Sequence, residues 1–229
     1  MTHYALVPAF NEERNIKEVI LRLKKHKNVN VIVVDDGSTD ATPRIVRNLG
    51  TVLVRHETNK GKGEALSSGF NYILKNCPKA KFVVVIDADM QYLPEEAMRL
   101  LKPLEEGKAD FVSGYRNWSE VPLRHRLGNF VWRRFFNILF GTDFKDTNCG
   151  YISLTRDAMK KIKKSIRGGY NIENSIFIGA IKSRLRIKQV PVTVIYREKS
   201  KVPRGISIVL GVFIFIISEG LKFRLGIKD

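Results

Sequence analysis

The chain has 229 residues and carries 40 Lys and Arg against 23 Asp and Glu, a formal net charge of +17. Hydrophobic residues make up 44% of it, with 17 Gly and 8 Pro. This composition excludes a disordered chain, which lacks residues for a core, and a collagen-like chain, which needs far more Gly and Pro. Two cysteines are too few for a disulfide framework, and the length suits one large domain with, at most, a short appendage.

The positive charge lies almost entirely in the second half. Residues 1–110 hold 17 basic and 15 acidic side chains, whereas residues 111–229 hold 23 basic and 8 acidic ones. Such asymmetry indicates a polyanionic partner: nucleic acid, an anionic membrane surface or a phosphorylated substrate. A solubilising cationic surface gives the same count, so the charge alone does not decide.

The first half alternates short β-branched runs with amphipathic segments. The runs predict strands at Tyr4–Val7, Val29–Val34, Val52–Val54, Phe82–Ile86 and Phe111–Ser113, and the segments between them predict helices at Glu13–Lys25, Thr42–Leu49, Gly63–Asn76 and Pro94–Glu106. This alternation predicts an α/β fold with a mostly parallel sheet covered by helices on both faces. Ligands of such sheets bind beyond the carboxyl ends of the strands.

The second half is basic and aromatic. Arg124–Gly141 predicts an amphipathic helix that either packs on the sheet or enters a membrane surface, and further helices are expected near Arg156–Lys164 and Ile172–Ser183, with a strand near Ile187–Tyr196. The apolar tail Ile206–Ile217 lies in a 14-residue window without charge, which is shorter than the about 20 residues that span a bilayer. It predicts a buried, re-entrant or interfacial helix, followed by returning positive charge as at a membrane surface.

Acidic side chains follow three predicted strands, in the segments that begin at Pro8, Asp35 and Asp87. Asp87, Asp89 and Gln91 alternate along an extended segment and so share one face. Their oxygens are hard ligands suited to Mg²⁺ or Mn²⁺ that also bridges substrate phosphates; capping of the next helix is the alternative. Neighbouring carboxylates repel, so without a metal ion we expect a compensating charge nearby.

Two further segments border these acids. Asp36, after the second strand, is suited to accept hydrogen bonds from a ribose or a base. The glycine-rich loop at residues 59–63 matches neither the P-loop nor the dinucleotide motif, which excludes an ATPase and a nicotinamide enzyme, and we interpret its glycines as a turn into a helix that begins near Glu64. The four histidines are scattered and predict no His-based metal site. Glu173 is interpreted as structural, with acceptor orientation as the alternative.

Several motifs occur in a set order: PAFNEE, VVDDGSTD, NKGKGEAL, DADMQYLPEE, GYR, RLGN, GYNIEN and VPVTVIYREKSK. Over about Tyr4 to Lys201 the chain resembles the inverting family 2 glycosyltransferases of GT-A fold, and within them the dolichyl-phosphate mannose or glucose synthases. The resemblance implies a Rossmann-like GT-A domain over 1–201, including the basic-aromatic helix at about 124–141, and a membrane-apposed apolar helix within 202–229. The sequence departs from the family at Tyr92, where His is usual, and at Cys149-Gly150-Tyr151, where Ser-Gly-Phe is more typical.

The resemblance also implies roles for individual residues. The nucleotide sugar is expected to contact Pro8, Phe10, Glu12, Val34, Asp36, Asp87, Ala88, Asp89, Gln91, Arg197 and Lys201, the last two through the diphosphate. Asp89 and Gln91 are expected to hold Mg²⁺ or Mn²⁺, and Arg116 and Arg126 the lipid phosphate. Asp87, Asp89 and Arg116 are the expected catalytic residues.

The expected reaction needs no general base. A polyprenyl monophosphate has a second pKa of about 6 and is already anionic at neutral pH, so it can attack the anomeric carbon unaided. We therefore expect transfer of mannose or glucose from a GDP- or UDP-linked donor to dolichyl or polyprenyl phosphate, by a peripheral or monotopic protein at the cytoplasmic face of the cell membrane. The alternatives are a hydroxyl acceptor on a glycan or glycolipid and, from another class, a basic nucleic-acid-binding module, which no known motif here supports.

Overall fold

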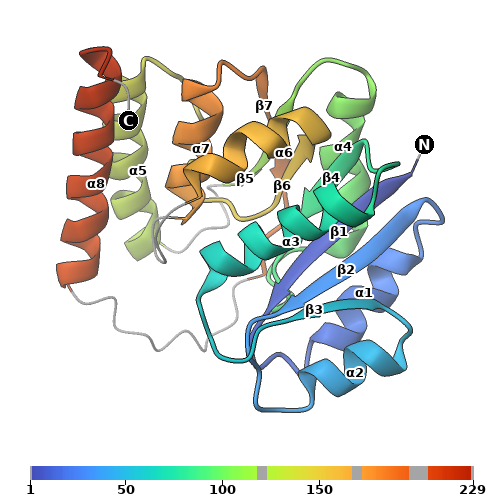
Figure 1. Cartoon of the computed structure of the whole chain (residues 1–229). Coiled ribbons are helices and arrows are strands. Elements are labelled where there is room, and N and C mark those ends of the chain that lie inside the picture. Colours follow the sequence, from blue (N-terminus) through green and yellow to red (C-terminus); the bar gives the residue numbers. More distant parts are fainter. Residues whose placement is uncertain (1, 118–122, 167–171, 196–205, 228–229) are drawn as a thin grey trace.

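The computed structural model describes residues 2–117, 123–166, 172–195 and 206–227, with side chains for all of these except 123–129 and 206–210. They form a central seven-stranded sheet with helices against both faces (Figure 1). The strands are β1 (His3–Ala9), β2 (Val29–Asp35), β3 (Val52–Arg55), β4 (Phe82–Val85), β5 (Phe111–Arg116), β6 (Ile152–Thr155) and β7 (Ile187–Val192).

The sheet is mostly parallel, as predicted. Its order is β3-β2-β1-β4-β6-β5-β7, and β6 runs antiparallel to both of its neighbours while the other adjacent pairs are parallel. The sequence pattern did not predict β6, which is only four residues long. The strand expected to reach Tyr196 ends at Val192, and Val194 forms an isolated bridge with Tyr92.

The helices lie close to their predicted positions. They are α1 (Ile16–Lys24), α2 (Thr42–Asn48), α3 (Lys62–Asn76), η1 (Pro94–Glu96), α4 (Ala97–Glu105), α5 (Leu123–Phe140), α6 (Arg156–Ile162), η2 (Lys163–Ser165), α7 (Ile172–Lys182) and α8 (Ile206–Arg224). Thr155 caps α6, because its hydroxyl accepts a hydrogen bond from Ala158 N at 3.1 Å.

Two apolar cores form because successive residues of each strand point to opposite faces of the sheet. Ala5 and Val7 of β1 belong to the core under α1, α2 and α4, whereas Leu6 belongs to the core under α3, α6 and α7. Gly69 lets α3 approach β1 closely, since a β-carbon there would lie 2.4 Å from Leu6 Cδ1. The prediction that helices cover both faces is therefore confirmed.

The predicted basic-aromatic helix is α5, and α8 lies beside it at one end of the molecule (Figure 1). Phe136 is fully buried, and the rings of Phe135 and Phe213 are 5.1 Å apart across the two helices. Arg224 Nε donates to Leu139 O at 2.8 Å, which ties the end of α8 to the end of α5. Within the residues described, no helix has both the length and the apolar character to cross a bilayer.

Candidate active site

The acidic segments meet at one edge of the sheet because β2, β1 and β4 are neighbours and parallel. Glu12 lies in the loop after β1, Asp36 directly follows β2, and Asp87 lies two residues after the end of β4. Burial raises the pKa of Glu12, and the negative charges of Asp89 and Asp87 raise it further, although a hydrogen bond from Asn15 opposes this. We call Glu12, Asp87 and Asp89 the acidic edge.

The residues expected to hold the nucleoside lie on β1 and β2 and in the loops that follow these strands. Pro8 and Val34 are buried register partners on β1 and β2, and Phe10 beyond them is 44% exposed. Asn11 joins the two following loops, because its N–H donates to Ser38 Oγ at 2.9 Å and its Oδ1 accepts from Thr39 N at 2.9 Å. An exposed aromatic ring beside two fixed loops fits a flat base.

Asp36 anchors a third loop. Its oxygens accept hydrogen bonds from Lys60 N at 2.9 Å and Gly61 N at 2.7 Å, and His56 Nδ1 lies 2.6 Å from Oδ1. Gly37 has φ 76°, and a β-carbon there would lie 2.5 Å from the backbone of residue 58, so only glycine allows this approach. The structure thus gives Asp36 a positioning role in the glycine-rich loop, and its contact with a nucleoside stays a prediction. The sequence analysis assigned no role to His56, because it considered the histidines only as metal ligands.

Asp89 fits a divalent cation. Gln91 N donates to Asp89 Oδ1 at 2.9 Å across Met90, whose φ is 60°, and the side chain of Gln91 is exposed while Ala88 is buried. Burial and the charge of Asp87 raise the pKa of Asp89, so this carboxylate lacks full compensation. Oxygen ligands of this kind suit Mg²⁺ or Mn²⁺. Among the described residues, no three His, Cys, Asp or Glu side chains form a metal cage.

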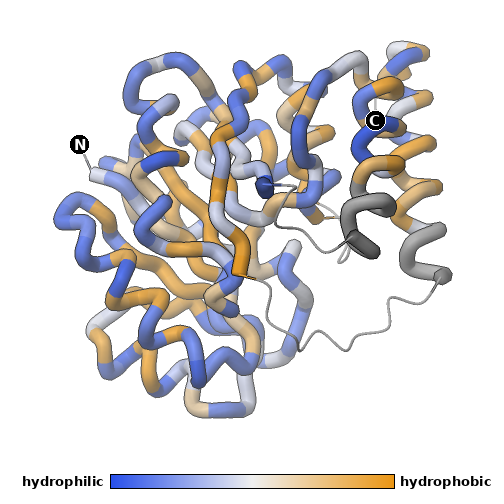
Figure 2. The backbone as a smooth tube through the Cα atoms, turned by 180° about the vertical axis from the view of Figure 1, so that it is seen from behind, coloured by the Kyte–Doolittle hydropathy of each residue, from blue (hydrophilic) through white to orange (hydrophobic). Residues whose placement is uncertain are grey.

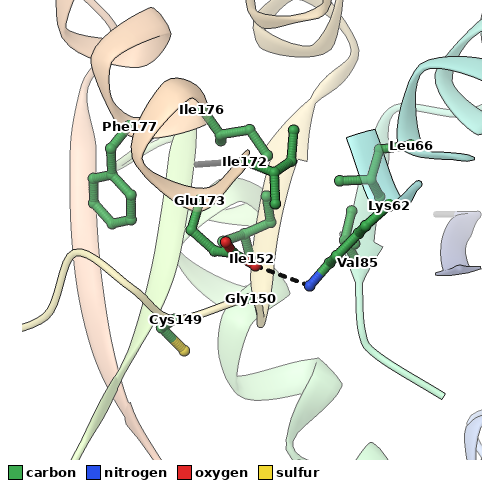
Figure 3. Close-up of a pocket in the computed structure, with 10 residues that line it drawn as sticks. All are labelled: Lys62, Leu66, Val85, Cys149, Gly150, Ile152, Ile172, Glu173, Ile176 and Phe177. Atoms are coloured by element: carbon green, nitrogen blue, oxygen red, sulfur yellow. Dashed lines mark hydrogen bonds and ion pairs between the residues drawn. The ribbon is translucent and has the colours of Figure 1, made fainter. Parts of the chain in front are cut away.

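The positive charge that we expected near the acidic strand ends is that of Lys62. Its Nζ lies 2.7 Å from Asp87 Oδ1 and 3.0 Å from Glu173 Oε1. Burial alone would lower the pKa of Lys62, but the two carboxylates raise it above its ordinary value. Lys62 and Glu173 point toward each other from α3 and α7 (Figure 3). Sequence reasoning had interpreted the loop with Lys62 only as a turn.

The residues that depart from the family pattern pack behind this ion pair. Gly150 N donates to the hydroxyl of Tyr92 at 3.3 Å, and the rings of Tyr92 and Tyr151 are 5.4 Å apart. Burial raises the pKa of the Cys149 thiol to about 12. Tyr92 is thus a buried phenol, and Cys149 is an inert thiol that lines a small pocket together with Lys62 and Glu173 (Figure 3).

Arg116 is held by an acid that the sequence reasoning missed. Its Nε and Nη2 donate to the carboxylate of Asp146 at 2.7 and 2.9 Å, and the two side chains are 15% and 2% exposed. Burial would lower the pKa of Arg116, but the bonds to Asp146 raise it overall. The guanidinium is therefore fixed and charged, and its contact with a lipid phosphate stays a prediction. The side chain of Arg126, and Arg197 and Lys201 entirely, lie outside the described residues.

The comparisons with known proteins now identify the family. The model of glycosyl transferase family 2 matches residues 4–163. The chain belongs to glycosyltransferase family 2. The UDP-N-acetylglucosamine–dolichyl-phosphate N-acetylglucosaminyltransferase of Methanococcus voltae is 30% identical, with 93% of this chain and 92% of that protein covered. The polyprenol monophosphomannose synthase of Mycolicibacterium smegmatis is 30% identical, covering 84% of this chain and 77% of the relative.

Solved structures show the same fold. Glucosyl-3-phosphoglycerate synthase of Mycobacterium tuberculosis, in complex with phosphoglyceric acid, superposes with a TM-score of 0.78 at 24% identity, covering 100% of this chain and 81% of the other. The same enzyme has been solved with Mn²⁺, UDP-glucose and phosphoglyceric acid, at a TM-score of 0.77. This family 2 chain therefore has a GT-A-like fold, as the motifs implied.

Proposed function

We propose that this glycosyltransferase moves a hexose or an N-acetylated hexosamine from a nucleotide sugar to polyprenyl or dolichyl phosphate, with inversion. The observation that carries the proposal is similarity over most of both chains to two relatives named for sugar transfer to such lipid phosphates. The site supports it, since Arg116, fixed by Asp146, and Asp87 of the acidic edge both lie close enough to Tyr92 to affect its pKa. Those two relatives are named for N-acetylglucosamine and mannose, so the sugar stays open between these and glucose.

The proposed chemistry is a direct displacement. An oxygen of the lipid phosphate forms the new bond to the anomeric carbon, while the bond from that carbon to the diphosphate breaks and the nucleoside diphosphate leaves with the electron pair. A bound Mg²⁺ or Mn²⁺ supplies positive charge to this leaving group. Asp89 and Gln91 hold that ion, and Asp87 faces the donor sugar. Arg116 orients the acceptor phosphate, which is ionised before it arrives, so no side chain must remove a proton.

The nucleotide is bound at the edge formed by β1 and β2. In this proposal Pro8 and Val34 form the floor, Phe10 contacts the base, and Glu12 and Asp36 face the ribose or base. Arg197 and Lys201, which follow β7 in the sequence, contact the diphosphate. These roles rest on the motif resemblance, and the exposure of Phe10 and the closeness of Glu12 to the charges of Asp87 and Asp89 support them.

We further propose that the surface formed by the two helices α5 and α8 binds the cytoplasmic side of the cell membrane. Phe130 and Ile138 of α5 are 52% and 60% exposed, and Ile214 of α8 is 65% exposed. A surface groove beside Phe130 and Ile138 is also lined by Arg133 and Arg134. Hydrophobic segments run along this pair of helices at the right-hand side of Figure 2. Apolar side chains beside cations match the boundary between anionic headgroups and acyl chains.

A sedimentation assay tests the membrane proposal. The protein is expected to pellet with vesicles of phosphatidylglycerol and phosphatidylcholine, and less so at high salt. Replacing Phe130 and Ile138 by Ser is expected to weaken binding, whereas Val52→Ser, at a 41% exposed site on β3, serves as the matched control. Equal binding by both variants, or no binding by the wild type, would contradict the proposal.

A transfer assay tests the reaction. Labelled GDP-mannose, UDP-glucose and UDP-N-acetylglucosamine are each incubated with dolichyl phosphate and Mn²⁺, and organic-phase label is counted. We expect one donor to label the lipid and Asp89→Asn to abolish the signal. Label found only on a glycan or glycolipid hydroxyl would favour the alternative acceptor class. Thermal stabilisation by an oligonucleotide but not by UDP or GDP with Mn²⁺ would favour a nucleic-acid-binding protein.

A further inference from the structure

An ammonium group lies between two carboxylates at the acidic edge. Lys62 opens α3, Asp87 follows β4, and Glu173 lies in the first turn of α7, so their contacts join three elements that are distant in the sequence. The three side chains are 28%, 24% and 22% exposed, and water therefore screens their charges only in part. Figure 3 shows Lys62 and Glu173 meeting beside Gly150.

We propose that Lys62 is a positioning residue that acts as the resident cation of the acidic edge. It holds Asp87 in one orientation and balances its charge, and it leaves Asp89 and Gln91 to the metal ion that arrives with the donor. This inference rests on the proposed function, because it assumes a metal-bound nucleotide sugar.

The packing around Asp87 supports a fixed orientation. Lys62 Nζ contacts both oxygens of Asp87, at 2.7 and 2.9 Å. A β-carbon at Gly150 would lie 2.8 Å from Asp87 Oδ2 and 3.0 Å from Lys62 Nζ, so the backbone closes directly over the ion pair. Asp87 is thus held by the charge of Lys62 and packed against the backbone at Gly150.

The electrostatics reach the expected metal ligand. Asp89 lies two positions after Asp87, whose Oδ1 is 2.7 Å from Lys62 Nζ, so the ammonium charge also acts on Asp89. Lys62 must then also repel a cation bound at Asp89. Removing its charge is expected to tighten binding of free Mn²⁺ about tenfold, because a positive charge that water screens only in part repels a second cation bound close to it. Transfer is expected to fall about a hundredfold, because misplacing a group that faces the substrate costs roughly that much.

The test compares Lys62→Met with Lys60→Met, an exposed lysine of the same loop. Binding of Mn²⁺ alone is measured by electron paramagnetic resonance, the melting temperature without and with Mn²⁺ by scanning fluorimetry, and kcat and KM by the transfer assay. Lys62→Met is expected to bind Mn²⁺ more tightly, to melt earlier without metal, to gain more from Mn²⁺ than the wild type gains, and to lose kcat. Lys60→Met should behave as wild type.

Glu173→Gln is the second variant, and it keeps the inference testable should Lys62→Met not fold. It removes a negative charge while leaving Lys62 in place, so it is expected to weaken Mn²⁺ binding, opposite in sign to Lys62→Met. Weaker Mn²⁺ binding in Lys62→Met, no difference from Lys60→Met, or an unchanged Mn²⁺ affinity in Glu173→Gln overturns the inference. Failure of the proposed function is distinct: the wild type then labels no lipid, while the Mn²⁺ measurements still report on Lys62.

Discussion

Replacing Asp146 by Asn is expected to destabilise the protein more than any single charge removal at its surface. Each carboxylate oxygen accepts two hydrogen bonds: Oδ2 from Arg116 Nε at 2.7 Å and from Arg116 N at 3.3 Å, and Oδ1 from Arg116 Nη2 at 2.9 Å and from Asn148 N at 3.0 Å. Asn keeps the shape and one acceptor. Its amide group, however, would face donors, and the guanidinium would lose its counter-charge.

The magnitude follows from the burial of the pair. Removing one partner of a buried ion pair costs about 3–5 kcal/mol, and the acceptor that Asn retains places this case near 3 kcal/mol. Asp146 is 2% exposed and Arg116 15%, so solvent does little to restore the loss. For a chain of this length each kcal/mol shifts the melting temperature by about 2–4 °C, so we expect a fall of roughly 6–12 °C.

The assay is urea unfolding followed by circular dichroism, with Asp143→Asn, an exposed acid three residues away, as control. A free energy of unfolding within about 0.5 kcal/mol of that control would refute the reasoning. The double variant Arg116→Met with Asp146→Leu adds a functional arm. Apolar replacement of both partners is expected to recover stability but not lipid-phosphate transfer. Retained transfer would remove Arg116 from the acceptor site.

Three further predictions concern Asp89, Gly150 and the ion pair of Asp110 with Arg186. Asp89→Asn should raise the melting temperature of the metal-free protein, because it relieves repulsion from Asp87; an unchanged value would contradict that repulsion. Gly150→Ala should lower kcat at least about tenfold, since its β-carbon would lie 2.8 Å from Asp87 Oδ2 and would displace that carboxylate. An unchanged kcat would mean that Asp87 and Lys62 can move aside without loss of activity. Hydrogen bonds from Arg186 hold the pKa of Asp110 below its ordinary value. The ion pair therefore stabilises the fold fully above about pH 4, the ordinary pKa of Asp. This stabilisation is lost as the pH falls through the lower pKa of Asp110 in the folded protein. Urea unfolding of Asp110→Asn should therefore differ from wild type at pH 7 and converge with it in acid.

The strands and helices of the first half were predictable because their apolar residues follow the two periods of a buried sheet and an amphipathic helix. One strand of the second half and one helix start were not. Strand β6 is as short as β3 and β4, but only Ile152 and Leu154 of its four residues are apolar, so no continuous apolar run marks it. Helix α1 begins at Ile16 and not at Glu13, because Glu13 bonds instead to the loop after β2, its N–H to Asp40 at 3.1 Å and its Oε2 to Ala41 N at 2.9 Å.

The acidic edge was predictable from one rule, that parallel strands end at the same side of the sheet. The ion pairs of the site were not. Lys62 and Glu173 are 111 positions apart, and Arg116 and Asp146 are 30 apart. Spacing along the chain shows which residues share a helix face or a strand end, but not which of 40 Lys and Arg side chains meets a given carboxylate. Which cation meets which carboxylate is determined by how the helices and loops pack against the two faces of the sheet.

The excess of positive charge in the second half also has a structural use that composition could not reveal. Arg156 donates to Leu74 O at 2.7 Å and Cys77 O at 2.8 Å, at the carboxyl end of α3, and Arg224 donates to Leu139 O near the end of α5. Cations at helix carboxyl ends satisfy carbonyls that the helix leaves unpaired and face its negative dipole end. These arginines therefore stabilise the fold whatever the partner is. The case for an anionic membrane rests instead on where cations and exposed apolar side chains coincide, along the α5 groove, and not on the net charge of +17.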